Sequence, residues 1–182
     1  MEMPGTYAYK QPMSKASSEK VYRDVLDFMS SHEFVDASRL GMVGISFGAN
    51  CATRMAVADN RLKAVIVNGA PLGRSLKPTG SFGMPELLVQ ALFGIVGAKS
   101  LLELKTSLHE LIPSRADIEQ IQCPVLAING ENDTLISTQD TIDLAAWAPK
   151  SELCLYPNDD HCAMGHLREW LKLNSEWLMK NL

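Results

Sequence analysis

The pentapeptide GISFG at residues 44–48 constrains the fold of this chain more than any other part of the sequence. It directly follows an apolar run at residues 40–45 and directly precedes residues 48–58, which are rich in small residues and good helix formers. A G-x-S-x-G sequence between a buried strand and a helix is typical of a nucleophile elbow, a sharp turn that presents a serine hydroxyl. We therefore expect Ser46 to lie above the carboxyl edge of a sheet. We also expect both glycines to be required sterically, because the turn leaves little room for side chains.

The rest of the chain alternates apolar runs with helical patterns. A strand buried on both faces is expected at residues 40–45, a second buried strand at 62–67, and further strands at 124–129 and 152–156. Helices are expected at 17–31, 48–58, from 85 onward, and at 99–111, 140–147 and 167–182. Alternation of this kind predicts βαβ units, hence an α/β fold with a mostly parallel sheet of about four strands and helices on both faces. The length of 182 residues suits one domain over residues 1–182.

Residues 72–122 interrupt the alternation between two consecutive strands. They begin with a stretch rich in glycine, proline and serine at 72–84, which predicts a loop, and continue with helical patterns. An insertion of this length that has helices of its own is typical of a lid over an active site. Its leucine-rich part also favours a substrate with an apolar portion, although packing of the lid onto the sheet explains the same residues.

A serine hydroxyl becomes a good nucleophile only when a neighbouring base removes its proton. The chain has four histidines, of which His32 and His109 lie in helix-like segments. His161 follows the last strand in a polar loop, where the base of this fold belongs, and is therefore preferred. His166, at the start of the last helix, is the alternative and is also interpreted as a cap or a surface residue.

The acid that orients the histidine should follow the third expected strand, because the chain order in this fold is serine, acid, histidine. Glu131 and Asp133 both lie there, and Asp133 is preferred because the G-x-x-D spacing places it at the tip of the loop. Asp159 and Asp160 are interpreted as loop residues, since neighbours in sequence rarely orient an imidazole well. The backbone N–H of Phe47, next to the serine, is the expected oxyanion donor.

Composition narrows the possible partners. The net charge of −4 and the pI near 5.6 give no indication of a nucleic-acid or acidic-membrane partner. The serine motif instead favours a small-molecule acyl substrate as the partner. The sequence contains no P-loop, no H-E-x-x-H and no dinucleotide fingerprint, so we expect neither cofactor nor metal. Four cysteines without a C-x-x-C pair, and no signal peptide, favour a reducing, cytoplasmic setting.

With these residues in place, the chain resembles the FrsA-like esterase group of α/β-hydrolases, which includes 2,6-dihydropseudooxynicotine hydrolase and fungal pigment hydrolases. The segments that carry the resemblance are MPGTYAYKQPMS, VDASRLGMVGISFGANCATRMA, RLKAVIVNGA, PVLAINGENDTLIS and DDHCAMGH. The family's serine, aspartate and histidine fall on Ser46, Asp133 and His161. The resemblance implies hydrolysis of carboxylic esters or related acyl bonds through an acyl-enzyme, or cleavage of a carbon–carbon bond next to a ketone.

The resemblance also carries one departure. Relatives normally have further strands ahead of the segment where this sequence starts, and the second oxyanion donor comes from a loop among them. We therefore expect an edge strand that lacks its usual neighbours. Two hypotheses follow from this edge strand: the chain is an inactive fragment that needs a partner chain, or it self-associates into a homo-oligomer. A separate hypothesis, for an active enzyme, is acyl transfer in place of hydrolysis.

Overall fold

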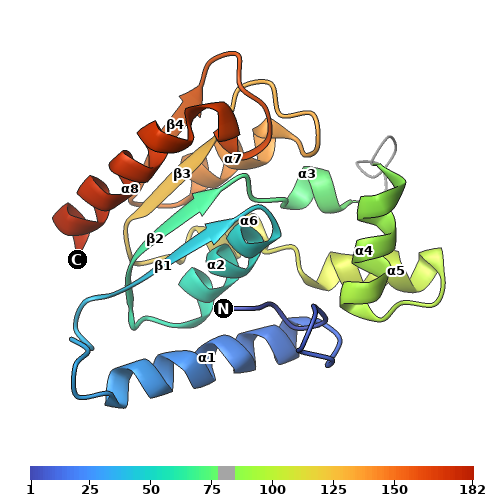
Figure 1. The fold of residues 1–182 in the computed structure, drawn as a ribbon, viewed down its shortest axis with the longest axis horizontal. Coiled ribbons are helices and arrows are strands. Elements are labelled where there is room, and N and C mark those ends of the chain that lie inside the picture. The colour runs from blue at the N-terminus through green and yellow to red at the C-terminus, as the bar shows by residue number, and fades with distance from the viewer. Residues whose placement is uncertain (78–84) are drawn as a thin grey trace.

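A computed structural model describes residues 1–77 and 85–182 of the chain. Four strands form one sheet in the order β1-β2-β3-β4, and every neighbouring pair is parallel. The strands are β1 (Leu40–Ile45), β2 (Leu62–Asn68), β3 (Val125–Gly130) and β4 (Ser151–Tyr156). Figure 1 shows the sheet with a helix following each strand. The predicted α/β fold with a parallel four-stranded sheet is confirmed.

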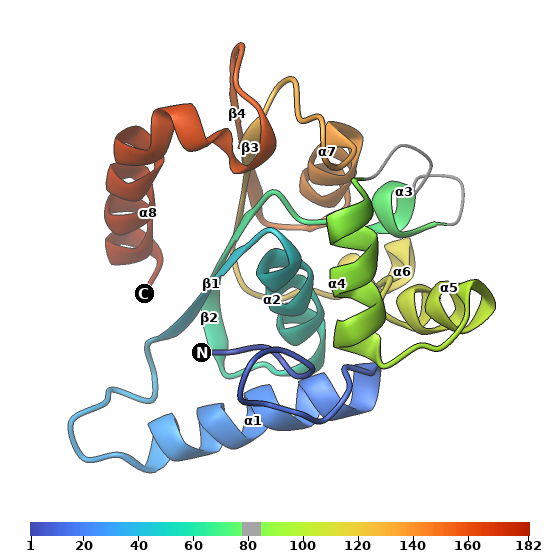
Figure 2. The ribbon, with the colours of Figure 1, turned by 45° about the vertical axis from the view of Figure 1, so that its right-hand side comes forward.

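Helices cover the two faces of this sheet. On one face lie α2 (Phe47–Ala58) and α7 (Thr138–Trp147), with α1 (Lys15–Ser31) packed outside α2. On the other face lies α8 (Leu167–Asn181), which Figure 2 shows on the opposite side of the strands from α2 and α7. Capping differs from the expectation in one detail, because Ser14 rather than Ser17 or Ser18 caps α1, in a reciprocal pair with Ser17.

The two central strands supply a core to each face by simple alternation. In β2, Val65 and Val67 belong to the core under α2, whereas Ala64 and Ile66 belong to the core under α8. Successive side chains of a strand point to opposite faces, so a strand covered on both sides is apolar throughout. This explains why the middle strands appear in the sequence as unbroken apolar runs.

The edge strand β1 departs from that pattern. It was expected to be buried on both faces, but Val43 and Ile45 are 46% and 45% exposed. Among the described strands β1 pairs only with β2, and the side chain of Leu178, near the end of α8, lies close to Gly41. The prediction of burial on both faces was therefore wrong for β1, whereas the prediction of an edge strand with one neighbour in a four-stranded sheet is confirmed.

The described part of the segment between β2 and β3 contains four helices, α3 (Gly73–Leu76), α4 (Glu86–Val96), α5 (Leu101–Glu110) and α6 (Arg115–Ile118). The expected loop at 72–84 is wrong for α3, and residues 78–84 of it lie outside the described part of the chain. The short helix forms because the buried carboxylate of Asp140 accepts hydrogen bonds from the N–H groups of Leu72, Arg74 and Ser75. These contacts satisfy backbone donors that the start of a helix otherwise leaves without partners.

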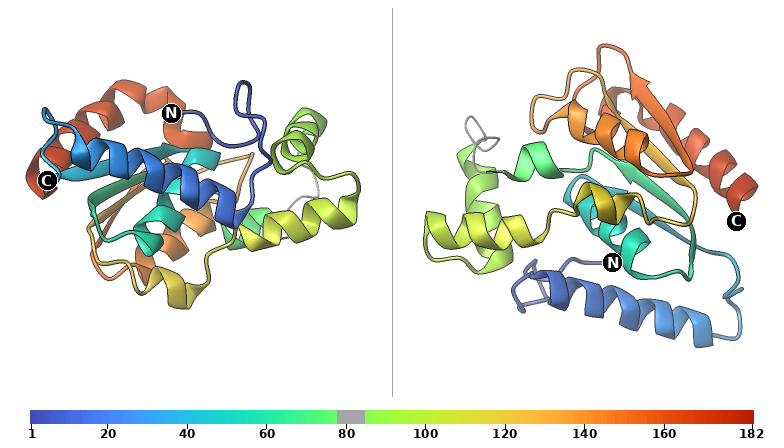
Figure 3. Two further views of the ribbon diagram at one scale, coloured as in Figure 1. Left: turned by 90° about the horizontal axis from the view of Figure 1, so that it is seen from below. Right: turned by 180° about the vertical axis from the view of Figure 1, so that it is seen from behind.

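Helices α4 and α5 pack onto the main core beside the sheet (Figure 3). Leu92, Val96, Leu104 and Leu108 are buried in the same cluster as residues of α1 and α2. The side-chain amide of Asn50 in α2 also donates to the carbonyl oxygens of Pro71, just before the insertion, and Leu111, just after α5. The insertion is therefore anchored to the sheet layer through α2.

Within residues 1–77 and 85–182, no single helix has the length and apolar content of a membrane span. Only α4 combined with the segment 101–118, which is bent by 71° from it, reaches that length and composition.

Candidate active site

Ser46 occupies the turn between β1 and α2 in a conformation that side chains rarely adopt, with φ 54° and ψ −123°. Its N–H donates to the carbonyl oxygen of Asn68 at the end of the neighbouring strand, at 2.8 Å. The turn brings Gly44 so close to α2 that an added Cβ would lie 2.3 Å from the carbonyl oxygen of Gly48. A strained strand-to-helix turn has these two features: a serine with φ > 0, here Ser46, and a preceding position without space for a side chain, here Gly44.

The steric expectation fails for the second glycine of the motif. A Cβ built on Gly48 meets no heavy atom within 4 Å among the described residues. A Cβ on Gly44 would meet the backbone of Gly48 and Ala49 at the start of α2, whereas a Cβ on Gly48 would point into open space. The requirement for glycine is therefore confirmed for Gly44 and wrong for Gly48.

His161 contacts both other predicted residues. Its Nε2 lies 2.8 Å from Oγ of Ser46, and its Nδ1 lies 2.8 Å from Oδ2 of Asp133. The expected polar loop is here a short 3-10 helix, His161–His166, whose first N–H donates to the carboxylate of Asp160. The imidazole is only 17% exposed, so it reaches solvent at its edge.

Asp133 is held from several directions at once. Its Oδ1 accepts from the N–H groups of Leu135 and Ile136, and its Oδ2 accepts from the side-chain amide of Asn129 as well as from His161. The side chain is completely buried. These donors keep the carboxylate in one orientation, and the loop residues 133–136 close around it.

The electrostatics of the pair follow from these contacts. Burial alone raises the pKa of Asp133, but its hydrogen bonds to His161, Ile136 and Asn129 outweigh burial and hold that pKa below its ordinary value. Burial also favours the neutral ring of His161, yet the Asp133 carboxylate outweighs it and raises the pKa of the imidazole. The two shifts share one contribution, the mutual stabilisation of carboxylate and imidazolium, and the neighbouring Cys162 thiol adds to the raised pKa of His161.

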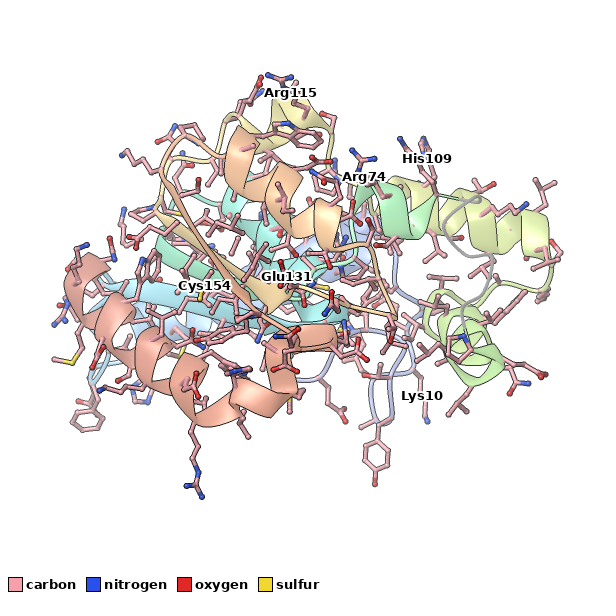
Figure 4. The ribbon with its side chains drawn as sticks, turned by 90° about the horizontal axis from the view of Figure 1, so that it is seen from above. Lys10, Arg74, His109, Arg115, Glu131 and Cys154 are labelled. Carbon is pink, nitrogen blue, oxygen red and sulfur yellow. The ribbon has the colours of Figure 1, made fainter. Side chains whose placement is uncertain are left out.

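The alternative residues lie elsewhere. Glu131 is exposed and lies at the end of β3, as Figure 4 shows from above, while His109 lies on the insertion, far from it in that view. His166 pairs with Asp159 at 2.7 Å and stacks on Tyr156. The geometry thus joins Ser46, His161 and Asp133 and leaves Glu131, His109 and His166 outside that chain of hydrogen bonds.

The other two aspartates near His161 shape its loop. Asp159 accepts from the N–H groups of Gly165 and His166, which closes the 3-10 helix. Asp160 accepts from the N–H and the hydroxyl of Thr134, so it ties the histidine loop to the loop that carries Asp133. Both are therefore loop residues, as expected: the Asp159 side chain holds the turn that follows His161, and the Asp160 side chain joins that loop to the loop of Asp133.

The backbone N–H of Phe47 lies in the first turn of α2. N–H groups there have no carbonyl one turn earlier in the helix, and they point along the positive end of the helix dipole. The amide is next to Ser46 and is therefore available to an anionic atom bonded to the serine. The Phe47 ring packs against the core.

Sequence reasoning missed two buried asparagines, Asn68, the last residue of β2, and Asn129, the residue before the last in β3. The side chain of Asn68 donates to the carbonyl oxygen of Cys162, and that of Asn129 accepts from the N–H of Cys162. The signal was present, because both strands end in an apolar run followed by Asn-Gly, at VIVNG and LAING. A polar side chain at the end of a fully buried strand needs a partner, and here the partner is the turn after His161.

Among the described residues, no three His, Cys, Asp or Glu side chains are grouped so that they would hold a metal ion. The arrangement that is present is a serine hydroxyl on an imidazole that a buried carboxylate orients. Chemically, such a chain can remove the proton from the serine as its oxygen attacks an acyl carbon.

Three comparisons place the chain among known proteins. Residues 20–147, more than half of the chain, match the family described as BAAT / Acyl-CoA thioester hydrolase C terminal. Esterase FrsA of Vibrio vulnificus is 24% identical over 149 residues, and 2,6-dihydropseudooxynicotine hydrolase of Paenarthrobacter nicotinovorans is 27% identical over 146 residues. These matches cover 77% and 79% of this chain but only 35% and 38% of the relatives. The chain thus spans little more than a third of the length of these curated relatives.

Solved structures support the same fold. The crystal structure of 2,6-dihydroxy-pseudo-oxynicotine hydrolase superposes with a TM-score of 0.87 at 22% identity, covering all of this chain and 51% of that one. The α/β hydrolase GrgF from Penicillium sp. sh18 superposes with a TM-score of 0.72 at 16% identity, covering 99% of this chain and 78% of that one. The chain has the α/β-hydrolase fold and belongs to the BAAT / acyl-CoA thioester hydrolase C-terminal family, a family of hydrolases.

Proposed function

We propose that this chain is a serine hydrolase that cleaves carboxylic esters or related acyl bonds through an acyl-enzyme on Ser46. The observation that carries the proposal is the 2.8 Å contact between Nε2 of His161 and Oγ of Ser46, with Nδ1 of the same ring on buried Asp133. A serine that only forms a turn does not need a neighbouring base or a carboxylate that fixes the other nitrogen of that base. A serine nucleophile needs the base to remove its proton and the carboxylate to orient the base.

The proposed reaction has two halves. Oγ of Ser46 attacks the acyl carbon while Nε2 of His161 takes the hydroxyl proton, and Asp133 stabilises the imidazolium that forms. The tetrahedral intermediate collapses as the same nitrogen returns the proton to the leaving group. Water then attacks the ester on Ser46 with His161 again as base, which releases the acid and restores the serine.

Phe47 supplies one oxyanion donor in this scheme. Its N–H lies beside the serine at the positive end of α2, so it faces the oxygen that becomes negative in the tetrahedral intermediate. The reaction as proposed uses no metal and no cofactor, because the attacking, accepting and stabilising groups are all on the chain.

The substrate class is proposed as a small molecule with an acyl bond. Support comes from the thioester hydrolase family that the chain belongs to and from its similarity to Esterase FrsA. The similarity to 2,6-dihydropseudooxynicotine hydrolase supports carbon–carbon cleavage next to a ketone as the second candidate. In both candidate reactions the same serine, activated by the same base, attacks a carbonyl carbon. The two reactions differ only in the leaving group.

Residues 72–122 are proposed as the lid of this site. Support comes from the described helices of the insertion, which lie beside the sheet and are held by Asn50 at Pro71, before α3, and at Leu111, after α5. A lid of this kind contributes to the substrate pocket and to the exclusion of water.

Labelling with a fluorophosphonate tests the proposal without knowledge of the substrate. The purified chain is incubated with the reagent, and its intact mass is recorded beside Ser46→Ala and His161→Ala. Ser175→Ala, a surface serine on α8, and His109→Ala, an exposed histidine on α5, serve as matched controls. We expect a single adduct on the wild type and on both controls, and none on the two site variants.

Two outcomes would contradict the proposal in different ways. An adduct that survives Ser46→Ala places the reactive serine elsewhere. No adduct on a folded wild type means that the chain by itself does not assemble an activated serine. In that case labelling is repeated with a longer version of the protein, and an adduct there would support the fragment hypothesis.

A further inference from the structure

One buried side chain contacts both the acid and the loop that carries the base. The amide nitrogen of Asn129 donates to Oδ2 of Asp133 at 2.9 Å, and its amide oxygen accepts from the N–H of Cys162, the residue after His161, at 3.0 Å. Asn129 has no exposed surface. Its side chain therefore bridges the two loops from below, at the end of β3.

The orientation of this amide is determined by its partners. Its oxygen also accepts from the N–H of Gly130, so two donors face it, while the nitrogen faces a carboxylate. A flipped amide would place its oxygen against the carboxylate and its N–H groups against backbone donors, which is unfavourable at these three contacts; the hydroxyl of Thr141, 3.4 Å from the amide nitrogen, can donate or accept in either orientation. Asn129 consequently fits one arrangement of Asp133 and Cys162 and no other.

The histidine turn needs such support because it is strained. Cys162 and Ala163, directly after His161, have φ 59° and φ 50°, in the left-handed region that side chains disfavour. Asn129 holds the N–H of Cys162, and Asn68 holds its carbonyl oxygen at 3.0 Å. The two asparagines thus fix that residue from both sides, and with it the direction in which the imidazole leaves the chain.

We propose that Asn129 is a positioning residue that sets the place of His161 relative to Asp133, and that this role, which rests on the proposed serine hydrolase function, determines how well the base serves Ser46. The same Oδ2 atom of Asp133 receives both the amide of Asn129 and Nδ1 of His161. Asn129 therefore aims the carboxylate at the ring while it holds the backbone next to the ring.

The test uses two variants of different shape and one matched control. Asn129→Ala removes the amide and leaves a space, and Asn129→Leu removes the amide and nearly keeps the volume. Asn174→Leu makes the same change at a buried asparagine of α8 that is outside the site and whose amide oxygen has no partner among the described residues. Each protein is characterised by thermal unfolding, by the fluorophosphonate labelling rate, and by NMR titration of the His161 ring.

The groups that face His161 are Asp133, Asp160, Cys162 and Ser46, and all of them stay in both variants. Without Asn129 the carboxylate is no longer aimed at the ring, so the raised pKa of His161 should fall toward its ordinary value by about half a unit or more. The labelling rate at its pH plateau should fall by about 10- to 100-fold, as expected for a misplaced base. The Asn174→Leu protein should match the wild type in both readouts.

A purely structural role would lower the thermal midpoint and leave the titration and the plateau rate unchanged, and that result would overturn the proposal. A pKa of His161 that rises in both Asn129 variants would overturn it as well, because Asp133 would then still be in place. The titration does not require the reaction. A wild type that does not label but whose His161 pKa depends on Asn129 would therefore refute the proposed function and still support the positioning role.

Discussion

Oδ2 of Asp133 lies 2.8 Å from Nδ1 of His161, although the two residues are 28 positions apart and belong to loops after different strands. They meet because β3 and β4 are parallel neighbours, so the loops that follow them leave the same edge of the sheet. The carboxylate of Asp160, in the loop of His161, also accepts a hydrogen bond from Thr134, in the loop of Asp133, and so holds the two loops together. The geometry of the site therefore depends on the arrangement of the strands at this edge of the sheet as well as on the three side chains.

The first prediction separates the two candidate acids. Asp133→Asn should lower the labelling rate and any esterase activity by about 10⁴-fold, because the amide favours the wrong tautomer of His161. Glu131→Gln, the same change at an exposed carboxylate, should alter them by less than about twofold, since solvent and salt screen that charge. Equal effects of the two substitutions would refute the assignment of Asp133.

The second prediction concerns pH. The base acts only as the neutral ring, and the Asp133 carboxylate raises the pKa of His161. The labelling rate should therefore rise with pH through an inflection above the ordinary histidine value of about 6.5. For stability the sign is opposite, since a raised pKa stabilises the fold at low pH and that contribution is lost as pH rises through the folded-state value. An inflection below 6.5 would contradict the geometry.

The third prediction compares the two glycines of the elbow. Gly44→Ala should lower the free energy of unfolding by about 3 kcal/mol, because its Cβ would collide with the backbone of α2. Gly48→Ala should stay within about 1 kcal/mol of the wild type, on the stabilising side, because alanine favours a helix and has space there. Chemical denaturation measures both, and similar losses at the two positions would contradict the structure of the turn.

The fourth prediction concerns the base of the insertion. Asp140→Ala should lower the free energy of unfolding by about 3 kcal/mol, because it leaves buried N–H groups of residues 72–75 without their acceptor. Asp143→Ala removes the pairing with exposed Arg74 and a hydrogen bond from the side chain of Gln139, and it should cost less than about 1 kcal/mol. If the two aspartates proved equally dispensable in thermal unfolding, Asp140 would not anchor α3.

The fifth prediction tests the apolar substrate. If the insertion contributes an acyl pocket, kcat/KM for acetyl, butyryl and hexanoyl esters should rise about two- to fourfold for each added methylene. In the structure Leu92 is buried in the core, whereas Leu87 is 77% exposed and free to contact a substrate. A flat series would mean that the leucines of the insertion serve packing only, and Leu87→Ser would then have no effect on specificity.

Much of this protein follows from local patterns in the sequence. Unbroken apolar runs marked the middle strands, because a strand covered on both faces has no polar side. The pentapeptide at 44–48 marked the turn that bears Ser46, because only a small residue fits at Gly44. The order of the loops after the strands was enough to nominate Asp133 and His161, since parallel strands bring these loops to one edge.

Other features depend on contacts between distant segments and were decided only by the tertiary structure. The exposure of Val43 and Ile45 depends on which elements flank β1. Helix α3 forms on a carboxylate, Asp140, that lies more than 60 residues later in the chain. Asn129 makes its hydrogen bonds to Asp133 and Cys162 only when the two loops that carry them fold over the end of β3. Local propensity acts over a few residues, whereas buried polar groups choose their partners across the fold, and that choice positions the site.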